Sequence, residues 1–186
     1  MRIDGYEAIE DYAAIGDGRT VALVARDGSI DWLPVPQLDD PPVFAALLDE
    51  RNGGRFLVRP VGEHEVDRRY VDETNVLQTT FSGAGGTVTV TDALTTQNGG
   101  LLPWVELARR IECTEGELEL EWLVEPRFEY GLTETTVEPR RDGFVARCLN
   151  HYLLIRAWDA GAPEQSASAV GARFTLRRGR ARSSSP

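Results

Sequence analysis

The sequence contains no lysine. All 20 of its basic residues are arginine, against 30 acidic residues and a net charge of −10. Binding to a phosphate backbone needs a basic face, so we expect no nucleic-acid partner. An acidic, lysine-free composition fits either adaptation to high salt, which screens self-repulsion, or GC-rich coding combined with an acidic surface. The acidic excess favours adaptation to high salt.

Long apolar runs are also missing, both at the N-terminus and at the length needed to span a bilayer. We therefore expect a cytoplasmic chain with no membrane partner. The only two cysteines, Cys113 and Cys148, are too few for a disulfide-rich scaffold, and we expect them to be reduced and buried. His64 and His151 lack partners at metal-ligand spacing, and no phosphate-binding loop or nucleophile elbow is present. We expect no metal and no cofactor.

A hairpin signal opens the chain. Residues 20–26 and 29–33 have strand character, and Asp27-Gly28 between them can form a two-residue type I′ turn. Four prolines between positions 34 and 42 then exclude both ladder hydrogen bonds and helix, which predicts an extended link. After this link, residues 43–52 fit a short helix that places Phe44, Leu47 and Leu48 on one face.

The rest of the chain has the period of two that is typical of strands. Gly83 to Gly86, Glu115-Gly116 and Asp142-Gly143 separate neighbouring runs as turns do. About a dozen strands are too many for one open sheet, so the pattern predicts an all-β fold, a two-sheet antiparallel super-β-sandwich with one short helix, over residues 1–178. The predicted strands after the hairpin are 56–61, 65–71, 76–82, 87–92, 104–113, 118–124, 135–139, 144–149, 153–158 and 172–176.

The C-terminal end has a different composition. Residues 1–160 hold 29 acids and 15 arginines, whereas residues 161–186 hold one acid and five arginines. The segment 179–186 has no apolar pattern and is predicted to be a disordered basic and serine-rich tail. An early stop or frame shift near Gly179 would explain it, and the alternative is a functional tail that docks on an acidic surface.

Several short motifs are more specific than composition or periodicity requires. They are Ile15 to Asp17, Arg19 and Thr20, Arg26 to Leu33, Phe44 to Leu48, Arg68 to Tyr70, Asn75 to Leu77 and Glu125 to Gly131. Together they resemble the N-terminal domain of bacterial and archaeal glucoamylase- and trehalase-like proteins of glycoside hydrolase family 15. Gln37 and Leu38 depart from the family's pattern, because members usually have arginine and phenylalanine there.

The resemblance implies inverting hydrolysis of an α-glucosidic bond, which needs two carboxylates roughly 6.5–9.5 Å apart. In the family both belong to an (α/α)6 barrel that follows the sandwich, so neither maps onto this sequence. The sandwich offers weaker candidates of its own, because a carboxylate against an aromatic ring can have its pKa raised by desolvation, as a general acid requires. These catalytic candidates are Asp31, Asp39 and Asp40, with Glu121 and Glu129 behind them.

Aromatic side chains offer a second kind of site, since sugars stack their apolar faces on tryptophan and tyrosine. Most of the six candidates are expected to be buried, above all Trp104 and Trp122, which alternate with apolar residues. The six are Trp32, Trp104, Trp122, Tyr130, Tyr152 and Trp158. Trp32 and the turn around Tyr130 have the better chance of reaching the surface. The predicted carbohydrate-binding or interface residues are Trp32, Gln37, Phe128 and Tyr130.

Three functions remain open at this point. The first is a non-catalytic accessory domain that supports a separately encoded (α/α)6 catalytic domain or binds α-glucan. The second is a hydrolase that releases glucose from α-glucans through its own carboxylates, and the third is a folded remnant without function. An interface without its partner would expose apolar surface, so we also expect self-association.

Overall fold

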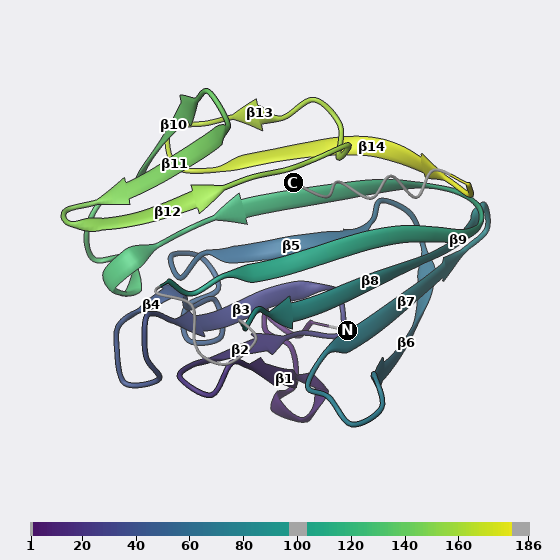
Figure 1. The fold of residues 1–186 in the computed structure, drawn as a ribbon, viewed down its shortest axis with the longest axis horizontal. Helices are drawn as coiled ribbons and strands as arrows, with labels where there is room; N and C mark the ends of the chain where they lie inside the picture. Colours follow the sequence, from purple (N-terminus) through teal and green to yellow (C-terminus); the bar gives the residue numbers. More distant parts are fainter. Residues whose placement is uncertain (1, 97–103, 180–186) are drawn as a thin grey trace.

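The computed structural model describes residues 2–96 and 104–179, and these residues form an all-β, sandwich-like fold (Figure 1). The helical segments among them are two short 3-10 helices, η1 (Ile9–Asp11) and η2 (Phe128–Gly131). The strands are β1 (Ala13–Gly16), β2 (Val21–Val24), β3 (Ser29–Pro34), β4 (Pro42–Phe44), β5 (Arg55–Pro60), β6 (His64–Tyr70), β7 (Leu77–Gly83), β8 (Gly86–Leu94), β9 (Leu107–Glu125), β10 (Thr136–Arg140), β11 (Gly143–Cys148), β12 (His151–Ile155), β13 (Glu164–Gln165) and β14 (Val170–Arg177).

Two sheets contain these strands. The larger has the order β1-β2-β3-β5-β9-β8-β7-β6, with β4 beside β3, β14 beside β9 and β13 beside β14. The smaller has the order β10-β11-β12. Every strand pairing among the described residues is antiparallel, so the predicted all-β antiparallel class is confirmed.

The strand β9 connects the two layers of the larger sheet. Its first part pairs with β8 as far as Gly116, and its second part pairs with β5 on one side and β14 on the other. In Figure 1 this strand curls back at one end of the molecule. The sequence predicted a turn at Glu115-Gly116 that separates two strands, and this prediction is wrong, because β9 continues through both residues. Gly116 instead permits a bend, with φ of 61° and a Cβ position that would lie 2.1 Å from the Gly85 carbonyl oxygen.

The core lies between the layers. Val24 and Ile30 from β2 and β3 belong to the same buried cluster as Phe81 and Val90 from β7 and β8. Their alternation with polar residues places one face of each strand inward. The prediction for the cysteines is confirmed, because Cys113 and Cys148 are both free and buried.

The opening hairpin forms over the predicted strands, but its turn is of another type. The Gly28 N–H donates to the Ala25 carbonyl at 3.1 Å, and the Ala25 N–H donates to Ser29 at 2.7 Å. Gly28 has a φ of 84°, whereas Asp27 does not have the positive φ that type I′ requires. The connection is a type I turn followed by a glycine bulge, which matches the register shift between β2 and β3.

The predicted helix over residues 43–52 is wrong. Pro42–Phe44 is instead the short strand β4, which pairs with β3. The Ala45 and Ala46 N–H groups donate to the carbonyls of Gly53 and Gly54, so the chain folds back against itself. Residues 42–46 are all buried, and a helix would have exposed one face of this segment.

Other differences are smaller. The predicted strand 153–158 is shifted to His151–Ile155, and β1, β13 and the short β4 were not predicted as strands. Residues 180–186 of the predicted tail lie outside the described residues, as do Met1 and 97–103. Within the described ranges, no helix has the length and apolar character to cross a membrane.

Candidate functional site

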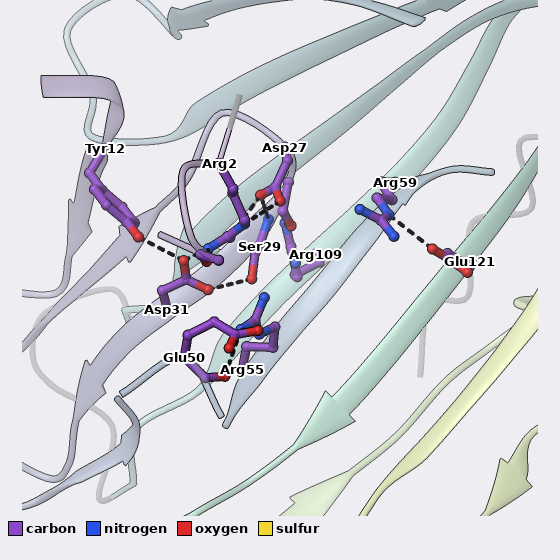
Figure 2. A network of polar contacts seen from close by, with 12 residues as sticks. Arg2, Tyr12, Asp27, Ser29, Asp31, Glu50, Arg55, Arg59, Arg109 and Glu121 are labelled. Atoms are coloured by element: carbon purple, nitrogen blue, oxygen red, sulfur yellow. Dashed lines mark hydrogen bonds and ion pairs between the residues drawn. The ribbon is translucent and has the colours of Figure 1, made fainter. Parts of the chain in front are cut away.

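Asp31 lies at the centre of a polar cluster on the outer face of the larger sheet (Figure 2). Its side chain is fully buried and accepts hydrogen bonds from three side chains. Ser29 Oγ donates at 2.5 Å, Tyr12 Oη at 2.7 Å and Arg2 Nη2 at 2.8 Å. Arg2 also binds Asp27 through Nε at 2.8 Å. These donors occupy the carboxylate, so Asp31 stabilises the fold and is closed to a substrate.

The same cluster shifts the ionisation of its members. Burial alone would raise the pKa of Asp27, but the hydrogen bonds and positive charge of Arg2 outweigh it and hold this pKa below its usual value. Burial raises the pKa of Tyr12, and the hydrogen bond to Asp31 raises it further. The cluster is therefore stable as a carboxylate–guanidinium–phenol assembly near neutral pH.

A hollow of about 430 Å³ lies beside this cluster. Leu57 and Leu123 contribute to its lining, and most of the remaining lining is charged. Two of its arginines have carboxylate partners, since Arg2 pairs with Asp27 and Arg55 Nη2 lies 3.7 Å from Glu50 Oε1. Exposed Arg51 also contributes to the lining. Arg59, which also lines the hollow, has its Nε 2.9 Å from Glu121 Oε1. Glu121, a weaker catalytic candidate, is therefore part of a surface ion pair.

A second charged pair lies between the layers. Arg109 and Asp92 are almost fully buried and form a bidentate ion pair, with an Nε–Oδ1 distance of 2.8 Å. The remaining Arg109 donors reach the carbonyls of Phe56 and Gly28, each at 2.8 Å. The guanidinium also lies 4.8 Å from the centre of the Phe56 ring. This arginine ties β8 and the first part of β9 to the opposite layer.

The other two catalytic candidates lie in the proline-rich link. Asp40 accepts the Gln37 N–H through Oδ2 at 2.9 Å, and the Asp40 N–H donates back to the Gln37 carbonyl. Asp40 thus closes a turn, while Asp39 and Gln37 are exposed. The structure does not bring Asp31 together with this turn as a pair, because Asp31 is enclosed by its own donors.

The structure does bring Trp32 and Tyr130 together. Their rings are 6.5 Å apart, Trp32 is half-buried and Tyr130 is 46% exposed. Tyr130 lies in η2, where Glu129 and Tyr130 both have left-handed backbone angles, with φ of 53° and 59°. Such angles cost energy for residues other than glycine and are found where surrounding contacts hold the chain. Residues in η2 thus present Tyr130 toward Trp32.

Phe128 is a correction to the sequence-based expectation of a surface site. It is 5% exposed and packs in the core. Its ring stacks against His151 at 5.7 Å, and His151 Nε2 lies 3.2 Å from Glu129 Oε1. The period of two that buries Leu120, Trp122 and Val124 continues through Pro126 to Phe128, so this alternation was a signal that could have placed Phe128 inward.

The expectation that most of the six aromatic candidates are buried is also wrong. Trp122 alone of the six is buried, and its indole N–H donates to the Ala160 carbonyl at 2.7 Å. Trp104 is 59% exposed, although its apolar neighbours suggested burial. Tyr152 and Trp158 are each 64% exposed.

Sequence reasoning missed the donors around Asp31. Ser29 and Asp31 alternate in β3, and Asp27 stands two residues earlier in the turn that precedes this strand, so the spacing of two was a signal for a shared polar face. Nothing local indicates Arg2 or Tyr12, which come from the N-terminal segment. Among the described residues, no group of three or more His, Cys, Asp and Glu side chains is placed to hold a metal ion.

Residues of the family-like motifs mostly hold the first strands in place. Tyr70 Oη donates to the Ala14 carbonyl at 2.9 Å and accepts the Ala14 N–H at 3.0 Å. Asn75 Nδ2 donates to the Gly16 carbonyl, and Asp17 Oδ1 accepts the N–H groups of Arg19 and Thr20. Their side chains support β1 and the turn after it.

Comparison with known proteins gives a consistent result. The family described as "Trehalase-like, N-terminal" matches residues 4–160. Trehalase 2 of Sulfolobus acidocaldarius is 36% identical over 135 residues, which cover 73% of this chain and 21% of the relative. The trehalase of Thermoplasma volcanium is 32% identical over 148 residues, with coverage of 78% and 24%.

A mycobacterial relative agrees with these two. The trehalase of Mycolicibacterium smegmatis is 33% identical over 149 residues, which cover 72% of this chain and 22% of the relative. The chain therefore spans between a fifth and a quarter of the length of these relatives. No solved structure matches. With its all-β fold and the match over residues 4–160, the chain belongs to the trehalase-like N-terminal domain family.

Proposed function

We propose that this chain is the non-catalytic N-terminal domain of a glucoamylase- or trehalase-like hydrolase of glycoside hydrolase family 15, and that it docks against the catalytic domain. The observation that carries the proposal is the match itself, which covers most of this chain but less than a quarter of each trehalase relative. Trehalose is the first substrate to test, because those relatives are named trehalases.

The polar groups of the domain support a structural role. Asp31, one of the three catalytic candidates, is buried and accepts three side-chain hydrogen bonds. Asp40 is engaged in a turn, where it accepts the Gln37 N–H. Asp39 is exposed, and neither Asp31 nor Asp40 is free to act with it as a catalytic pair. An inverting hydrolase needs two carboxylates that face each other across a sugar. The proposal therefore assigns catalysis to the other domain.

The docking surface is the η2 face, defined by Trp32, Tyr130, Leu132 and Leu149. Leu132 follows η2 and is 86% exposed, and Leu149, in the turn between β11 and β12, is 62% exposed. His151, two residues later, contacts both Phe128 and Glu129, which places this turn against η2. Figure 1 shows η2, β4 and the β11–β12 turn at the same end of the molecule. Exposed apolar side chains grouped in this way favour a protein interface.

The test combines this chain with the trehalase-like catalytic segment of its own genome, whether that segment follows on the same polypeptide or is encoded separately. We expect the two parts together to release glucose from trehalose, and neither part to do so alone. Leu132→Asp places a charge on the η2 face and should abolish the association measured by analytical ultracentrifugation. Ile9→Asp is the matched control, because Ile9 is 85% exposed and lies in η1.

Two results would contradict the proposal. Glucose release by this chain alone, abolished in Asp39→Asn, would make it a hydrolase in its own right. Association that survives Leu132→Asp and a parallel Leu149→Asp variant would exclude the η2 face.

Self-association follows from the same surface. Without a catalytic domain, the η2 face remains exposed and is expected to bring two copies of the chain together. Sedimentation at moderate and high salt should give a dimer or larger species, and Leu132→Asp should give a monomer. A monomeric parent chain under both conditions would be evidence against an apolar docking face.

A further inference from the structure

A second hollow lies on the smaller sheet, away from the η2 face. Because β11 and β12 are antiparallel, with Phe144 opposite Ile155, the start of β11 lies beside the end of β12. The turn Arg141-Asp142 therefore meets the segment from Arg156 to Trp158, and together they line a hollow of about 460 Å³. Gly143 fixes this approach, because a Cβ there would lie 2.3 Å from the Ile155 carbonyl oxygen.

Among the described residues, the polar side chains in this hollow have no hydrogen-bond or ion-pair partners. Within the described residues, Arg141, Asp142 and Arg156 form no side-chain hydrogen bond and no ion pair. All three are exposed. Two guanidinium groups supply donors and one carboxylate supplies acceptors, so the hollow offers both halves of a hydrogen-bonding site.

Trp158 forms the apolar part of the same hollow. It is 64% exposed, and a single-chain protein gains nothing in stability from an indole left in water. The segment that carries it is nevertheless held, because Ala160, two residues on, accepts the hydrogen bond of the buried Trp122 indole at 2.7 Å. Asp159, between them, has a left-handed φ of 52°. The exposed position of Trp158 is thus built into the fold.

We propose that this hollow is a saccharide-binding site, in which the Trp158 indole stacks on the apolar face of a pyranose ring. Arg141, Asp142 and Arg156 then hydrogen-bond the ring hydroxyls, which are both donors and acceptors. A neutral polyhydroxyl ligand fits better than an anion, because the lining carries the Asp142 carboxylate as well as the two arginines. The volume is within the range of small-ligand sites. The choice of an α-glucoside as the ligand rests on the proposed function. The choice of a saccharide rests on the exposed Trp158 ring beside the three polar side chains.

The test uses the 186-residue chain with maltotriose and trehalose as ligands and inorganic phosphate as the competing probe. The four tryptophans give four indole N–H signals in a ¹H–¹⁵N spectrum, and Trp158→Phe identifies the one from Trp158. We expect a saccharide to shift that signal in a saturable way. Trp158→Ala should weaken the affinity measured by calorimetry by about tenfold or more.

Trp104→Ala is the matched control, because Trp104 is exposed to a similar extent, at 59%, outside this hollow. Affinity should be unchanged in it, and both variants should keep the thermal unfolding temperature of the parent. Arg156→Gln should also weaken binding, while it leaves the Trp158 signal in place.

Three results would overturn the site: no saturable shift with either saccharide, binding that survives Trp158→Ala, or a shift with phosphate but not with a saccharide. These outcomes are independent of the docking proposal. If the hollow fails to bind while the combined domains hydrolyse trehalose, the saccharide site alone is wrong. If the hollow binds and the domains do not associate, the proposed docking is wrong.

Discussion

The two hollows of this domain are similar in size, about 430 and 460 Å³, but opposite in chemistry. In the first, three of the four lining arginines, Arg2, Arg55 and Arg59, each lie beside a carboxylate, so these three have little capacity left for a ligand. In the second, Arg141, Asp142 and Arg156 have no partner in the described residues. A binding site is thus marked by unused hydrogen-bonding capacity beside an exposed ring, and not by volume or number of charges.

Burial explains why the first cluster is closed. Asp31 is fully buried, and a buried carboxylate without partners would cost several kcal/mol. The N-terminal segment supplies the compensation through Arg2 and Tyr12. Exposed residues in the turn between β10 and β11, and just after the end of β12, carry no such penalty. Solvent satisfies Arg141 and Arg156 until a ligand replaces it.

The largest effect is expected at the most enclosed pair. Arg109→Met leaves the fully buried Asp92 carboxylate unpaired and removes the donors to Phe56 and Gly28. We expect it to lower the free energy of unfolding by about 3–5 kcal/mol, as measured by urea denaturation. The control is Arg110→Met at the neighbouring position, whose ion pair with Glu112 is exposed and should contribute less than about 1 kcal/mol.

A double variant tests whether charge is the cause. Asp92→Leu combined with Arg109→Met removes both charges, so it should recover much of the stability lost in the single variant. A double variant as unstable as Arg109→Met would show that packing, and not the unpaired carboxylate, carries the effect.

Arg2→Ala opens the first cluster and should have the next largest effect. Loss of charged hydrogen bonds to Asp27 and Asp31 should lower the free energy of unfolding by about 2–3 kcal/mol at pH 7. Arg2 holds the pKa of Asp27 below its unfolded value, so this part of the stabilisation is present above about pH 4 and is lost as the pH falls through the lower folded pKa. Urea denaturation from pH 7 to pH 3 should show the gap between parent and variant shrinking. With the exposed Arg140→Ala as control, any difference should stay small throughout.

The stability that this cluster contributes at alkaline pH depends on Tyr12. Burial and the hydrogen bond to Asp31 raise the pKa of its hydroxyl, so its contribution is complete below the unfolded pKa of about 10 and is lost as the pH rises through the higher folded value. Tyr12→Phe should destabilise by about 1–2 kcal/mol at pH 7 and by less above pH 10 or so. Equal destabilisation at pH 7 and pH 11 would mean that the Tyr12 hydroxyl has the same pKa in the folded and unfolded states, and so contradict the raised folded value.

The fold was predictable where neighbours in sequence decide it. The strands on either side of Asp27-Gly28 follow from local alternation and a glycine turn. The segment Pro42–Phe44 does not, because its hydrogen bonds come from β3 and those of the next residues come from Gly53 and Gly54. The bend of β9 at Gly116 also depends on a distant contact, the Gly85 carbonyl. A local pattern contains no information about either contact.

The sites follow the same rule. The alternation of Asp27, Ser29 and Asp31 indicates a shared polar face, but the sequence does not reveal that Arg2 encloses it. Trp158 was expected to continue a strand that in fact ends at Ile155, and this early end is what exposes its ring. Exposure of an aromatic residue depends on where pairing stops, which alternation alone does not fix.

The smallest effect is expected in the open hollow, and it completes the contrast with the first. Arg156→Gln removes a charge as Arg2→Ala does, but no carboxylate loses a partner and no buried group is left unsatisfied. The free energy of unfolding should therefore change by less than about 0.5 kcal/mol, at both low and high salt. A loss of 2 kcal/mol or so would mean that Arg156 supports the hairpin tip in solution, and the hollow would then be closed in the same way as the first. A neutral result leaves the guanidinium free for a ligand.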